Sequence, residues 1–246
     1  MGRDAAAAGS PRGLTAGVGA ARWALASGLA LQLAAGAASA DEAQASAQIA
    51  ALPPRGAAVA AFVPSGWVIA QHLEADLDQD KTHDAVLVLL QDERTAGDRQ
   101  RALVVLLQRA EGFVLGGRNF GLLPFLDGAG VKGGDGAPEL KVDRGVLIVE
   151  QFGGSREFYG STSRFRWNRA RGCFELIGED TSSGDSLDHS VSSTSCNLIT
   201  RRCETTVMSA KFDSEGNEIP TRTTVTRYRL PKQPLPTLEK PDFVSK

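Results

Sequence analysis

Histidine, cysteine and aromatic residues are scarce in this chain. Its 246 residues include three His, three Cys and only 6% Phe, Trp and Tyr. A zinc site needs several His or Cys ligands at close, regular spacing, whereas the three His lie singly along the sequence. The sequence therefore gives no indication of a zinc site.

A strong charge of one sign is also missing. Lys and Arg number 27 against 29 Asp and Glu, so no strong field attracts nucleic acid or anionic lipid. Four Arg lie between Arg164 and Arg171, among Phe165 and Trp167. Alternation along a strand places such Arg on the solvent face and the rings in the core. We therefore expect no nucleic-acid partner.

A long apolar run is absent except near the N-terminus. Three Arg precede the run Trp23–Ala37, which is shorter than the ~20 residues needed to span a bilayer. Ala38-Ser39-Ala40 offers small residues at a cleavage point. Residues 1–40 are predicted to be a signal peptide cleaved before Asp41, which leaves no permanent membrane anchor. The predicted location is the periplasm or the cell exterior.

Composition divides the rest of the chain into three parts. Residues 41–60 are rich in Ala and contain Pro53-Pro54. We expect a leader that is flexible or forms a short helix, with too few large apolar residues to form a core. Residues 61–230 carry the strand patterns and form the predicted β-rich domain. Residues 231–246 contain four prolines and are predicted to be an extended tail draped over a sheet edge.

Short apolar runs indicate that the domain is built from β-strands. Ala85–Leu90, Ala102–Leu107 and Val146–Val149 are too short for helices and have no 3.6-residue period. Residues 124–138 and 181–195 are predicted to be surface loops because Gly, Ser, Thr and Asp dominate them. We expect an all-β fold of mainly antiparallel sheets, either sandwich-like or a partial, propeller-like stack.

The three cysteines have different predicted roles. Cys196 and Cys203 flank a stretch that is typical of a hairpin, where facing Cβ atoms come within disulfide distance. An exported protein permits such a bond. Cys173 is expected to be a small buried hydrophobic residue on a strand.

The clearest chemical feature is an Asp-rich loop directly before the apolar strand at Ala85. Residues 76–84 read Asp-Leu-Asp-Gln-Asp-Lys-Thr-His-Asp. Calcium needs several converging oxygens, and carboxylates at loop positions one, three, five and nine with a carbonyl at position seven supply them. An EF-hand is excluded because its twelfth position is Leu87 and the flanks indicate strands. The predicted metal ligands are Asp76, Asp78, Asp80, the Thr82 carbonyl and Asp84.

An alternative for this loop is a solvated acidic turn held by its own carboxylates. Position six of a calcium loop is usually Gly, but here it is Lys81, which reaches that backbone geometry only with strain. Four Asp in nine residues repel one another unless a positive charge neutralises them. This repulsion favours bound calcium, with a structural role at the start of a central strand.

The D-x-D-x-D-x-x-x-D loop entering an apolar strand resembles the calcium loops of FG-GAP and VCBS-type proteins, whose repeats build β-propeller blades. The order of further motifs, over about residues 60 to 230, resembles a group of secreted bacterial proteins of unassigned function. These motifs are Phe62–Trp67, the Asp loop with Asp84–Leu90, Gly133–Asp135, Gly153–Ser155, Phe165–Trp167, Phe174–Gly178 and Ser195–Thr200. The resemblance implies an exported β protein with a single FG-GAP-like loop.

We therefore predict an exported envelope protein that is not an enzyme. It binds or scaffolds an envelope protein or a glycan, with calcium as a structural cofactor.

Two alternatives stay open. One is a hydrolase that uses the polar loop around Ser186 and His189, because Gly184–Leu187 spells the nucleophile block of GDSL esterases. No His follows His189 to complete the distant Asp-x-x-His of those enzymes. The other is a carbohydrate- or partner-binding module, whose sign would be an exposed aromatic patch beside the Gly128–Gly136 loop.

Overall fold

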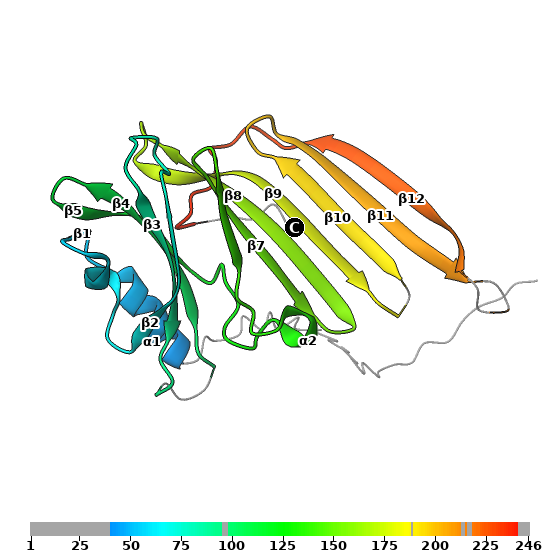
Figure 1. Cartoon of the computed structure of the whole chain (residues 1–246). Helices are drawn as coiled ribbons and strands as arrows, with labels where there is room; N and C mark the ends of the chain where they lie inside the picture. Colours follow the sequence, from blue (N-terminus) through cyan, green and yellow to red (C-terminus); the bar gives the residue numbers. More distant parts are fainter. Residues whose placement is uncertain (1–39, 95–97, 188, 213–214, 216–217, 241–246) are drawn as a thin grey trace, which may run out of the picture. The chain divides into compact units, whose positions relative to one another are not determined.

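The structure is a computed structural model that describes residues 40–94, 98–187, 189–212, 215 and 218–240 (Figure 1). The predicted signal peptide, apart from its last residue, and the final part of the predicted tail lie outside these residues. None of the helices in the described ranges has the length and apolar character needed to cross a bilayer.

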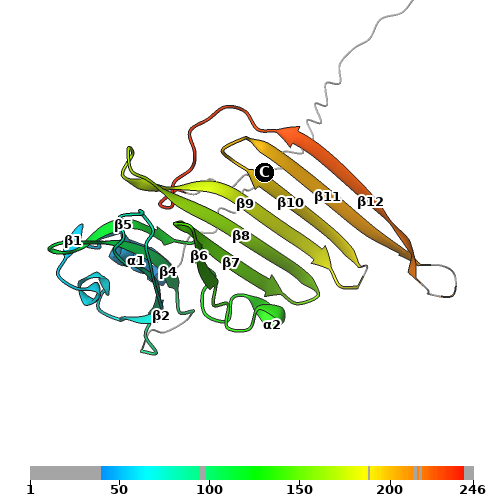
Figure 2. The ribbon, with the colours of Figure 1, turned by 45° about the horizontal axis from the view of Figure 1, so that its top comes forward.

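Two antiparallel sheets form the fold, in agreement with the predicted class (Figures 1 and 2). Five strands are ordered β1-β5-β4-β3-β2 in the first sheet, and seven are ordered β12-β11-β10-β9-β8-β7-β6 in the second. The first sheet contains β1 (Arg55–Gly56), β2 (Trp67–Ala75), β3 (Asp84–Gln91), β4 (Arg101–Arg109) and β5 (Gly112–Phe120). The second contains β6 (Glu139–Asp143), β7 (Val146–Gly154), β8 (Glu157–Asn168), β9 (Cys173–Asp185), β10 (Ser190–Asn197), β11 (Arg202–Phe212) and β12 (Glu218–Arg229). The sheets pack together as a sandwich-like pair.

The central strands β3 and β4 are buried on both faces, as their continuous apolar runs predicted. One face packs against the second sheet. Its contacts include Val86 and Leu103 from the first sheet with Leu147 and Phe165 from the second. The other face of β3 and β4 forms a second core with helical elements at the beginning of the described chain.

The predicted leader is helical, which was one of its two alternatives, but the expectation that it takes no part in a core was wrong, because two helical elements cover the first sheet. They are α1 (Ala40–Ala50) and the 3₁₀ helix η1 (Val59–Phe62). Ala45 and Ile49 of α1 are buried in the second core. Small Ala residues let a helix approach a sheet closely, so one Ile is enough to fill the contact.

The prediction of a surface loop at residues 181–195 was also wrong. This segment lies mainly in β9 and β10, which pair directly with each other. Most of its side chains are partly exposed, so Ser and Thr can occupy both faces of the sheet. The apolar pattern that identifies a buried strand is therefore missing. Farther along the chain, β11 and β12 are antiparallel partners.

Cys196 and Cys203 form the predicted disulfide between directly paired positions of β10 and β11. Cys173, at the start of β9, is a free thiol and only half-buried, so the prediction of a buried residue was too strong. Its partial burial raises the pKa of its thiol.

The described part of the predicted tail, residues 231–240, ends in a turn at residues 237–240 and contacts both sheets. In it, the buried Leu238 donates its backbone N–H to the Phe174 carbonyl of β9. Its own carbonyl accepts a bond of 2.6 Å from Asn119 Nδ2 of β5. The tail therefore contributes Leu238 to the core shared by the two sheets.

We predict that Ile49→Ala lowers the free energy of unfolding by about 2–4 kcal/mol, because it leaves a cavity between α1 and the first sheet. Denaturant unfolding measures this change, and Gln44→Ala, on the exposed side of α1, is the matched control with little effect. Equal stability of the two variants would mean that α1 does not pack on the sheet.

Candidate metal centre

The Asp loop connects β2 to β3, and its last residue, Asp84, is fully buried. One carboxylate oxygen of Asp84 accepts the Leu77 N–H, and the other accepts the Gln108 N–H of β4, both at 2.9 Å. Burial raises the pKa of Asp84, although these two hydrogen bonds oppose that rise. Asp84 therefore links the beginning of the loop to the neighbouring strand β4 through hydrogen bonds to a single carboxylate.

Asp76 closes the loop from its other end. Its two oxygens accept the backbone N–H groups of Asp80, at 3.1 Å, and Lys81, at 3.0 Å. Lys81 has a φ of 75°, in the left-handed region that favours Gly. The strain predicted at position six of the loop is therefore present, and the Asp76 carboxylate holds the strained turn.

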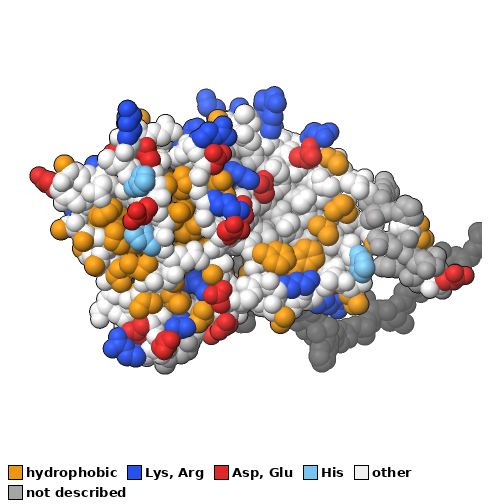
Figure 3. Space-filling model, in the orientation of Figure 1, with side chains coloured by type: hydrophobic (Ala, Val, Ile, Leu, Met, Phe, Trp, Pro, Cys, Tyr) orange, Lys and Arg blue, Asp and Glu red, His pale blue; other side chains and the backbone are white. Residues whose placement is uncertain are grey.

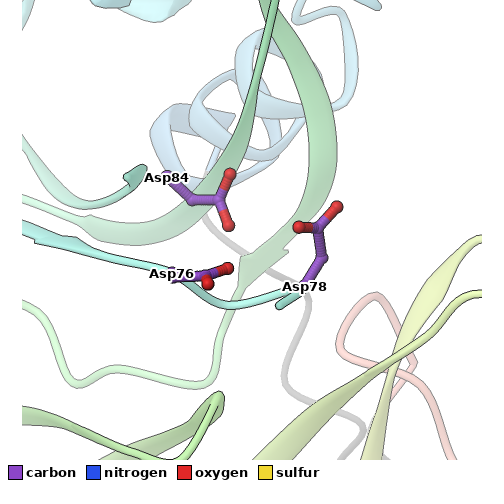
Figure 4. Close-up of side chains that lie close together, drawn as sticks. All are labelled: Asp76, Asp78 and Asp84. Carbon is purple, nitrogen blue, oxygen red and sulfur yellow. The ribbon is translucent and has the colours of Figure 1, made fainter. Parts of the chain in front are cut away.

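Three of the predicted ligands come together. Oxygens of Asp76, Asp78 and Asp84 all lie within 4.8 Å of one another (Figure 4). Two ligands on opposite sides of a calcium ion are about 5 Å apart, because each oxygen lies 2.3–2.6 Å from the ion. The spacing of the three carboxylates therefore suits a single cation.

Asp78 adds an independent observation. Its side chain is only 5% exposed. Its Oδ1 atom is buried without a hydrogen-bond partner in the described part of the chain. A buried carboxylate oxygen without a partner is costly, and a cation among the three carboxylates would remove that cost.

Asp80, a predicted ligand, lies outside this cluster. Its Oδ1 accepts the backbone N–H of Thr82, at 2.8 Å, and also the Thr82 hydroxyl. Its Oδ2 pairs with Arg109 at 3.1 Å. These hydrogen bonds, with the Thr82 hydroxyl first, lower the pKa of Asp80. Thr82 thus contributes its N–H and hydroxyl to the turn itself.

Arg109 is the residue that the sequence did not reveal. It lies at the end of β4 and reaches Asp78 Oδ2 at 2.6 Å as well as Asp80. Part of the negative charge of the loop is therefore neutralised by the protein itself. No local motif could have identified Arg109, because it is 31 residues from Asp78 in the sequence.

The loop also contacts turns of the second sheet. Arg169, between β8 and β9, donates a bond of 2.9 Å to the Asp78 carbonyl. Gln79 donates to the Arg144 carbonyl, between β6 and β7, at 3.1 Å. The Asp loop is therefore a joint between the two sheets, and its order affects how they meet.

The polar loop proposed for a hydrolase is the turn between β9 and β10. Ser186 Oγ donates a hydrogen bond of 2.8 Å to the Arg156 carbonyl. A carbonyl oxygen cannot act as the base that activates a serine nucleophile. This arrangement gives no support to a nucleophilic Ser186.

Comparisons with protein-family models, with curated proteins and with solved structures found no match to this chain. The resemblance to FG-GAP and VCBS-type loops therefore stays a prediction.

We predict that Arg109→Met lowers the free energy of unfolding by about 1–3 kcal/mol, because it leaves the buried charge of Asp78 without its partner. The double variant with Asp78→Asn should lose less than the sum of the single losses, as measured by denaturant unfolding. Arg94→Met breaks a pair with Asp92 in which the Arg is 88% exposed, and it is the control with little effect. Additive losses would show that Arg109 does not act through Asp78.

Proposed function

We propose that this chain is an exported, non-enzymatic binding protein whose Asp loop holds a divalent cation, calcium, in a structural role. The observation that supports this proposal most directly is that Asp78, a member of the cluster of three carboxylates, has a buried Oδ1 atom without a partner in the described residues.

The chemistry of the ligands favours calcium over softer metals. All three clustered groups are carboxylates, and no described His or Cys lies among them. Hard cations prefer such oxygen ligands, and calcium accepts an irregular set completed by carbonyls and water.

The position of the loop favours a structural role over a catalytic one. Asp76 and Asp84 already accept backbone N–H groups, which fix their orientation. A cation bound to them would stiffen the joint between the sheets. Fixed carboxylates with their oxygens directed inward suit this task, whereas a catalytic metal needs an open coordination position toward a substrate.

We predict that calcium at about a hundredfold its dissociation constant raises the melting temperature by about 5–10 °C over the value in chelator. Asp78→Asn should abolish most of this shift, because it removes the charge of the buried ligand. Asp143→Asn, an exposed carboxylate on β6, should keep the full shift in differential scanning fluorimetry. An unchanged melting temperature of the unmutated protein would rule out the cation site.

We predict that Lys81→Gly, in contrast to Asp78→Asn, strengthens calcium binding. The change removes a positive charge beside the site, and it stabilises the fold by about 0.5–1 kcal/mol by relieving the left-handed backbone. Gln79→Gly is the matched control, because Gln79 is also left-handed, with a φ of 61°, but carries no charge. Calcium titration by calorimetry should show tighter binding for Lys81→Gly alone; equal affinities would contradict a cation beside Lys81.

A further inference from the structure

One face of the second sheet carries a polar groove across β6, β7, β8 and β9. The groove has a volume of about 390 Å³, within the size range of small-molecule sites. Its lining follows the strand register in two neighbouring rows. The first row is Glu139, Glu150, Thr162 and Asp180, and the second is Phe152, Gly160 and Ser182.

Phe152 lines one side of the groove. Phe152 is 50% exposed, and its ring packs against Phe158 with centroids 6.1 Å apart. Lys132, in the short helix α2 (Gly130–Gly133), lies 4.6 Å from the centre of the Phe158 ring. An aromatic pair, in which Phe152 is exposed and Phe158 partly exposed, therefore lies beside the Gly128–Gly136 loop. Figure 3 shows hydrophobic side chains next to a basic one over the α2 end of this sheet.

The carboxylates of the first row are held in place by neighbouring bases. Lys141 contacts both Glu139 and Glu150 at 2.9 Å. Arg164 contacts Asp180 at 2.7 Å. A carboxylate has about four acceptor positions, so each group keeps capacity for a ligand hydroxyl. With Lys132, three acids face three bases, so the groove has no net charge that would attract an anionic ligand.

Gly160 forms the floor between the aromatic ring and Ser182. A Cβ atom at this position would lie 2.8 Å from Ser182 Oγ and 3.6 Å from the Phe152 ring. The missing side chain therefore keeps the space between ring and hydroxyl open.

We propose that this groove binds a neutral glycan. A pyranose presents C–H groups on one face, which suit the negative face of an aromatic ring, and hydroxyls at its rim, which donate to carboxylates and pair with Ser and Thr. Phe152 would take the C–H face, while Glu150, Asp180 and Thr162 would take the hydroxyls. The inference rests on the proposed binding function and names its ligand class.

A glycan array that carries neutral, uronate-containing and sulfated glycans tests this directly with the purified protein. We expect binding to neutral glycans and none to the acidic ones. Binding to no glycan, or to acidic glycans alone, overturns the inference.

Variants of the groove then locate the site with the best neutral glycan from the array. Phe152→Ala and Glu150→Gln should each raise the dissociation constant by about tenfold or more in calorimetry. Tyr228→Ala removes a similarly exposed ring, 41% exposed, from β12 of the same sheet, and should leave binding unchanged. Equal affinities of the Phe152 and Tyr228 variants, at unchanged melting temperatures, would place the glycan elsewhere and overturn the assignment.

Two further readouts separate this inference from the proposed function. Release of new reducing ends from a bound glycan would show an enzyme and contradict the non-enzymatic proposal, because paired carboxylates also catalyse glycoside hydrolysis. A calcium-dependent shift of the melting temperature without glycan binding would contradict the glycan inference but support the proposed cation site.

Discussion

The buried carboxylate of Asp84 is the interaction on which the rest of the site depends. Because its two oxygens accept N–H groups from the loop and from β4, it fixes the backbone at the point where β3 begins. Leu77, which donates one of these bonds, also places its side chain in the core shared by the two sheets. The carboxylate geometry and the packing of the sheets are therefore parts of one arrangement. Disturbing either one changes the other.

The sequence predicted those features that arise from local pattern. Apolar runs of six residues identified β3 and β4, because strands buried on both faces need no alternation. The spacing of Cys196 and Cys203 identified a hairpin pair, and the spacing of the Asp residues brought three of the predicted ligands together. The left-handed backbone at Lys81 also followed from the loop pattern.

Features that depend on distant contacts could not be predicted in this way. The counter-charge at Arg109 comes from another strand, and it pairs with Asp80, which lies outside the cluster. The helix α1 has few large apolar residues, so its pattern alone did not indicate a packed element. The strands between 181 and 195 were hidden by their Ser and Thr content, since a partly exposed strand does not need an apolar face. In each case the fold, and not the local sequence, determines the role of the residue.

The contact made by Leu238 has a consequence for the order in which the molecule can form. Leu238 comes later in the sequence than all the strands, yet it lies between Phe174 of one sheet and Asn119 of the other. A polypeptide that emerges N-terminus first can assemble its hairpins early, since they are local. The contacts of Leu238 with the two sheets cannot form until this late segment has been synthesised. The contacts of Leu238 with both sheets are therefore the last contacts of this core to become available as the chain is made.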